Sequence, residues 1–151
     1  MSAIKESIVI DRPPDEVFAY ATDPSHIPEW QGSAVEAHLV GDAPPGVGSR
    51  VSVTRRVGRR TMPMTMEYTE FDPPRSWRVD GIDGPVRGHV HGTVEPLEGG
   101  RRSRLTLDLD FESHGLGKVL VPLVVRPQVR KEMPKNEQRL KDLLEGGTTT
   151  A

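Results

Sequence analysis

Hydrophobic and polar residues alternate along much of the chain between residues 4 and 112, a pattern typical of strands with one buried face. The alternation is cleanest over residues 105–112, where three leucines and Phe111 share one side and carboxylates occupy the other. Clusters of glycine and proline separate the alternating segments and mark turns. The pattern predicts strands over residues 4–10, 33–40, 50–57, 61–71, 76–80, 86–94 and 105–112.

Two short helices are expected between the first and second strands. Pro13-Pro14 can open the first one, because proline lacks only a donor that the first helical turn does not use. Asp23-Pro24 ends this helix, and either Asp23 or Ser25 can cap a second one that runs through residues 27–30.

The pattern changes to helical spacing between residues 116 and 145, where leucines and valines recur every three or four positions. Pro122, Pro127 and Pro134 leave two interpretations open. The segment forms either two helices joined by a loop or one long helix, kinked where proline removes a hydrogen bond. The last residues, 146–151, are expected to form a flexible tail.

Composition limits the classes of protein that fit. The length of 151 residues suits a single domain, predicted over residues 1–145, with a core of its own. The net charge of −2 and the lack of aromatic residues among the arginine clusters argue against nucleic-acid binding. There is no cysteine, which excludes disulfides and thiolate ligands. No apolar run approaches the ~18 residues of a membrane span, and no signal-peptide core is present, so we expect a soluble, cytoplasmic protein without stable membrane insertion.

Four segments resemble, in their order, the SRPBCC superfamily, which includes START and birch-pollen-allergen-like proteins. They are "IVIDRPPDEVFAYATDPSHIPEWQ", "YTEFDPPRSWRV", "GPVRGHVHGTVEPLEGGRRSRLTLDLDF" and "RLKDLLEG". The resemblance is closest to the polyketide cyclase/dehydrase-like branch. It implies an α+β helix-grip fold, in which a curved antiparallel sheet of about seven strands grips a long C-terminal helix. Two short helices follow the first strand.

The resemblance also implies a cavity for an apolar ligand between sheet and helix. The residues agree with this, because Gly88 and Gly92 share a strand face with valines and leave little side-chain volume there. Methionines on the neighbouring strand would add an adaptable wall. The residues expected to contact the ligand are Trp30, Val53, Arg55, Met64, Met66, Tyr68, Trp77, Val90, Leu120 and Val124.

Three of these residues have competing interpretations. Trp30 either stacks on a ligand at the cavity mouth or plugs the core. Arg55 shares a side with valines and either binds a ligand anion or is turned to solvent by a bulge. Tyr68 shares the methionine side and could donate a hydrogen bond into the cavity.

The remaining clusters of polar residues predict neither a metal site nor a catalytic site. His89 and His91 point the same way from one strand, but two ligands are too few for zinc, so no metal site is expected. Asp108, Asp110 and Glu112 alternate with apolar residues and are expected to lie on a solvated face.

The first functional hypothesis is therefore a module that binds a small hydrophobic or aromatic molecule, lipid-like or polyketide-like, without a cofactor. The second is an enzyme of the polyketide cyclase or dehydratase type, in which Arg55 or Tyr68 stabilises an enolate. The third is a regulatory or partner-binding role. A homodimer is compatible with all three.

Overall fold

The computed structural model describes residues 4–41, 44–84, 86–113, 115, 118 and 121–146. Seven antiparallel strands form one sheet in the order β1-β7-β6-β5-β4-β3-β2. The strands are β1 (Ile4–Ile10), β2 (Ala34–Val40), β3 (Arg50–Val57), β4 (Arg60–Asp72), β5 (Ser76–Gly81), β6 (Val86–Leu97) and β7 (Arg102–Ser113). All seven predicted strands are present, and β6 and β7 are longer than the alternation indicated.

The connection between β1 and β2 contains α1 (Pro14–Thr22), the 3₁₀ turn η1 (Pro24–His26) and α2 (Ile27–Trp30). Asp23 makes the break between α1 and η1, because its side chain accepts a hydrogen bond from the Ser25 backbone N–H at 3.0 Å. The turn residues near the N-terminus therefore divide one potential helix into short pieces, as predicted.

The C-terminal segment forms a π-helical turn, η3 (Val121–Val125), followed by one helix, α4 (Arg126–Gly146). Pro127 is the second residue of α4, which continues directly from η3. Pro134 lies inside α4 without ending it. The helical segment therefore runs without a loop from Val121 to Gly146, and over these residues the interpretation as two helices joined by a loop is wrong.

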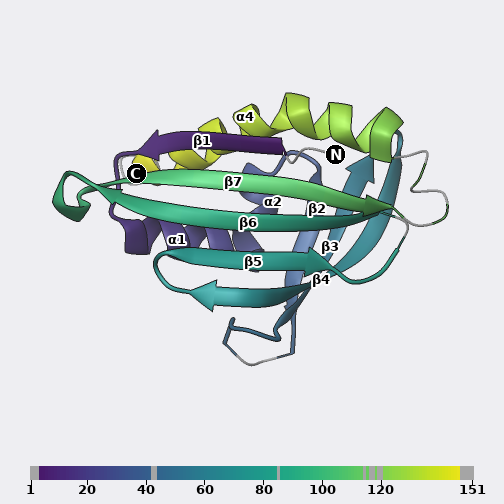
Figure 1. Ribbon diagram of the computed structural model, residues 1–151, viewed down its shortest axis with the longest axis horizontal. Coiled ribbons are helices and arrows are strands. Elements are labelled where there is room, and N and C mark those ends of the chain that lie inside the picture. Colours follow the sequence, from purple (N-terminus) through teal and green to yellow (C-terminus); the bar gives the residue numbers. More distant parts are fainter. Residues whose placement is uncertain are drawn as a thin grey trace.

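The sheet curves around α4, which runs beside β1, while β3 and β4 reach toward the start of the helix (Figure 1). A short 3₁₀ turn, η2 (Glu98–Gly100), joins β6 to β7 at the opposite end. The core lies between sheet and helices, where Ile10, Val17, Leu105 and Leu140 have essentially no exposed surface. This arrangement confirms the helix-grip fold and leaves the inner face of the sheet opposite α4.

Candidate functional site

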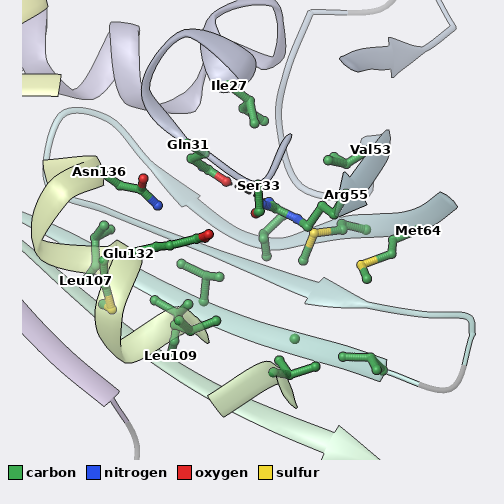
Figure 2. Close-up of a pocket in the computed structure, with 18 of the residues that line it drawn as sticks. Ile27, Gln31, Ser33, Val53, Arg55, Met64, Leu107, Leu109, Glu132 and Asn136 are labelled. Atoms are coloured by element: carbon green, nitrogen blue, oxygen red, sulfur yellow. Dashed lines mark hydrogen bonds between the residues drawn. The ribbon is translucent and has the colours of Figure 1, made fainter. Parts of the chain in front are cut away.

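A cavity of about 150 Å³ lies between the inner face of the sheet and α4. Its walls are mainly apolar, because most of the inward residues of β3, β4, β6 and β7 are valines, methionines and leucines. Val125, Val129 and Met133 close it from the helical side. Figure 2 shows these side chains around the open volume, with a few polar groups gathered at one end.

The structure places eight of the ten predicted contact residues on the cavity wall. These are Trp30, Val53, Arg55, Met64, Met66, Tyr68, Trp77 and Val90. Leu120 lies outside the described residues. Val124 does not line the cavity. Its Cγ1 atom packs 3.3 Å from the position that a Cβ of Gly58 would occupy.

The interpretation of Trp30 as part of the core is confirmed, and its stacking on a ligand stays a prediction. Its side chain is only 3 % exposed and belongs to the core, and it also lines the cavity. The indole N–H is buried and finds no hydrogen-bond partner within the described residues. A buried donor without a partner costs free energy, so a ligand acceptor at this position would stabilise the site.

The interpretation in which Tyr68 could donate a hydrogen bond into the cavity is wrong. Its ring lines the cavity, but its hydroxyl donates to the carbonyl oxygen of Thr22 at 2.9 Å. Burial, followed by the nearby charge of Asp23, raises the pKa of Tyr68 to about 12. The hydroxyl therefore stays protonated and ties the end of α1 to the sheet.

Arg55 lines the cavity together with Val51 and Val53 of β3, so the interpretation in which a bulge turns it to solvent is wrong. Its guanidinium donates from Nη1 to the Ser33 hydroxyl at 3.1 Å and from Nη2 to the Gln31 side-chain oxygen at 2.7 Å. Burial lowers the pKa of Arg55 to about 10, so the group remains a cation at neutral pH.

The two hydrogen-bond acceptors of Arg55 are neutral. No carboxylate of the described residues lies within ion-pair distance, although the charge of Glu132 opposes the fall in the pKa of Arg55. Arg55 is partly buried, and a charge that is removed from water is usually paired, because its desolvation is costly. The guanidinium therefore provides an electrostatic site for an anionic or strongly electron-rich group inside the cavity.

Two polar residues of α4 complete this end of the cavity, and sequence reasoning missed both. Glu132 extends from the helix toward Ser33 and Arg55 (Figure 2). Asn136 lines the cavity and accepts a hydrogen bond from the Gly32 N–H at 3.0 Å. Their helical spacing from Val125 and Val129, which share the same face, was the signal that could have identified them.

Only one of the two glycines expected to open space on β6 does so. Gly88 lines the cavity, and a Cβ there would sit 3.5 Å from Phe111. Gly92 is covered by the indole of Trp77, its partner across the strand pair, and a Cβ there would overlap the ring. The volume released by Gly92 is therefore filled by tryptophan.

The histidines lie on the outer face of the sheet, and both are partly buried. The Nδ1 of His89 is 2.6 Å from Asp80 and its Nε2 is 2.9 Å from Glu112. Burial lowers the pKa of His89, and the hydrogen bonds to the two carboxylates outweigh it, so that the net shift is upward. No group of three potential metal ligands is present in the described parts of the chain.

The sequence over residues 1–145 matches the family model described as polyketide cyclase/dehydrase and lipid transport. The chain belongs to this family. The match covers almost the whole length of the chain. The apolar cavity is consistent with the lipid transport named in the description of the family. No curated protein matches the sequence.

Solved structures with the same fold come from several groups of proteins. TTHA0849 from Thermus thermophilus is 18% identical, with a TM-score of 0.77 over 96% of this chain and 98% of its own. The Zhui aromatase/cyclase from Streptomyces sp. R1128 is 15% identical, with a TM-score of 0.76 over 95% and 93%. A START superfamily protein from Mycobacterium smegmatis is 15% identical, with a TM-score of 0.70 over 97% and 96%. These likenesses establish that the chain shares its fold with START superfamily and aromatase/cyclase proteins.

Proposed function

We propose that this family member binds a compact hydrophobic or aromatic molecule between the sheet and α4, with the polar group of the molecule directed to Arg55. The observation that carries the proposal is an apolar cavity in which the partly buried guanidinium of Arg55 has only neutral hydrogen-bond partners. The walls favour an apolar body, and the guanidinium favours an electron-rich oxygen at one end.

The volume limits the size of the ligand. An engineered apolar cavity of about 150 Å³ in another protein holds benzene. The present cavity has the same volume and therefore suits a molecule of one ring without rearrangement. A longer polyketide or acyl chain would need the wall to move.

Toluene, p-cresol and p-toluate form a probe series that varies the polar group on one apolar ring. The two tryptophans of the chain both line the cavity, so their two indole N–H signals in a ¹H–¹⁵N spectrum report its occupancy. We expect both signals to shift and p-cresol to bind more tightly than toluene. Val90→Phe, which fills the cavity, should abolish both shifts. If no member of the series moves either signal or raises the melting temperature, the proposal fails.

A second candidate function is dehydration or cyclisation of a small carbonyl compound. It is favoured by Arg55 and Glu132, which line the same end of the cavity. In a β-hydroxyketone, the Glu132 carboxylate would remove the α-proton while the guanidinium stabilises the enolate oxygen. The enolate would then expel the β-hydroxyl group as hydroxide. The hydroxide would accept from Glu132 the proton that was removed from the α-carbon, and it would leave as water.

The test for this reaction is the absorbance of the conjugated ketone formed from a β-hydroxyketone that carries one phenyl ring. We expect turnover to fall at least about a hundredfold in Glu132→Gln, with binding of p-cresol retained. An absence of turnover in the native protein would remove the enzymatic candidate and leave the binding function intact.

A further inference from the structure

Two segments far apart in sequence meet at one end of the molecule. The turn between β3 and β4 packs on η3 and on the first turns of α4 (Figure 1). The Gly58 N–H donates to the Gln128 side-chain oxygen at 3.1 Å, and the Gln128 amide donates to the Arg56 carbonyl at 2.9 Å. These hydrogen bonds fix the two segments side by side.

Both segments are strongly cationic. Residues 51–66 contain four arginines and no carboxylate, and residues 115–131 contain two arginines, two lysines and no carboxylate. Because the net charge of the chain is −2, the remaining residues together carry −10. The positive charge is thus concentrated at this end of an otherwise acidic protein.

Most of this charge is available to a partner. Six of the eight cationic side chains are exposed, namely Arg56, Arg59, Arg60, Lys118, Arg130 and Lys131. None of the six forms an ion pair with a carboxylate of the described residues. Of the other two, Arg55 faces the cavity and Arg126 is buried beside Asp110.

An exposed apolar group lies among these cations. Leu123 in η3 is 70 % exposed, Pro122 beside it is also exposed, and the next residue, Val124, packs on Gly58 in the cationic turn. A large apolar side chain within a basic surface is the combination that favours the interface of an anionic membrane.

We propose that this basic end, residues 56–60 with Lys118 and residues 122–131, is a docking surface for an anionic lipid bilayer. The cations bind lipid headgroups, and Leu123 enters the boundary between headgroups and acyl chains. Binding is peripheral and reversible, since no helix in the described part of the chain is long and apolar enough to cross a bilayer.

A nucleic acid is the main competing anionic partner, and the composition disfavours it. Neither residues 51–66 nor residues 115–131 contain a phenylalanine, tyrosine or tryptophan on which bases could stack. The exposed leucine has no role in contacting phosphates. Docking does not depend on the ligand proposed for the cavity, so the two proposals fail separately.

Co-sedimentation with vesicles tests the surface. The probes are vesicles of phosphatidylcholine alone and of phosphatidylcholine with phosphatidylserine at about 7:3. We expect the full chain to sediment only with the anionic vesicles and to be released at high salt. Each cation near the membrane contributes about fivefold in affinity, so Arg59→Gln/Arg60→Gln should weaken binding at least about tenfold. Leu123→Ser should also weaken it.

The matched control removes the same charge at the opposite end of the sheet. Arg101→Gln/Arg104→Gln, beside the turn between β6 and β7, should change binding by less than about twofold. Circular dichroism confirms that each variant is folded. The proposal is overturned if the native protein ignores anionic vesicles, or if the control weakens binding as much as the test variant. It is also overturned if an oligonucleotide binds more tightly than the vesicles and Leu123→Ser has no effect.

Discussion

The indole of Trp77 lies directly on the backbone of Gly92, its partner across the β5–β6 pair. The contact leaves no room for a Cβ atom and fixes the tryptophan against the inner face of the sheet. Phe18 packs edge-on against the same indole, with ring centroids 5.6 Å apart. Gly92 therefore determines the position of the Trp77 indole, which forms part of the cavity wall.

We expect Gly92→Ala to destabilise the protein by about 2 kcal/mol, because the new methyl group displaces a buried indole. Urea unfolding and the tryptophan emission spectrum measure the two effects. Gly88→Ala is the matched control on the same strand face, since its Cβ would meet Phe111 at an ordinary 3.5 Å. Equal losses of stability in the two variants would contradict the role given to Trp77.

Arg55→Met should change which ligand the cavity prefers. A hydrogen bond to a charged group contributes about 1.5–3 kcal/mol, so the affinity for p-cresol should fall by about tenfold or more. The affinity for toluene should change by less than about threefold, because its contacts are apolar. Calorimetric titration of both compounds measures the difference, and parallel losses for the two would place the polar group of the ligand away from Arg55.

Tyr68→Phe separates stability from ligand binding. The hydroxyl donates to the Thr22 carbonyl, and its loss leaves that buried acceptor without this donor. We expect the free energy of unfolding to fall by about 1 kcal/mol, with ligand affinity unchanged. A loss of affinity at unchanged stability would instead mean that the hydroxyl serves the ligand.

Glu137 on α4 should make stability depend on pH. Its side chain is 2 % exposed, and burial, assisted by the charge of Glu6, raises its pKa to about 8 from an ordinary 4.5. The folded state therefore holds a proton that the unfolded state releases. The free energy of unfolding should fall as pH rises from about 4.5 to 8, and this loss should be complete above pH 8.

Glu137→Gln should remove this part of the pH dependence. Between pH 5 and pH 9, the free energy of unfolding of the variant should rise relative to that of the native protein by on the order of 2 kcal/mol. The full shift in the pKa of Glu137 sets an upper limit of about 5 kcal/mol on this change. Urea unfolding across this pH range is the measurement. Glu6→Gln should reduce the dependence only partly, because burial is the larger cause. An unchanged pH profile in Glu137→Gln would show that another group is responsible.

The strands and helices could be predicted largely from local pattern. Alternation over residues 105–112 identified the buried face of β7, and the turn residues around Asp23 identified the division of the first helical segment. The same alternation placed Arg55 on the inner face of β3. These are local properties, because the side-chain direction along a strand and the start of a helix depend on residues a few positions apart.

Only the tertiary structure decided what these side chains meet. Gln31 and Ser33 lie more than 20 residues before Arg55 in sequence, and Glu132 lies on the C-terminal helix. The hydroxyl of Tyr68 meets a carbonyl 46 residues away. The sequence by itself determined the strands and their buried faces, and the resemblance of four of its segments to the SRPBCC superfamily implied the helix-grip architecture. The cavity and its polar end arise from the curvature of the sheet around α4, which brings distant residues together and which no local periodicity encodes.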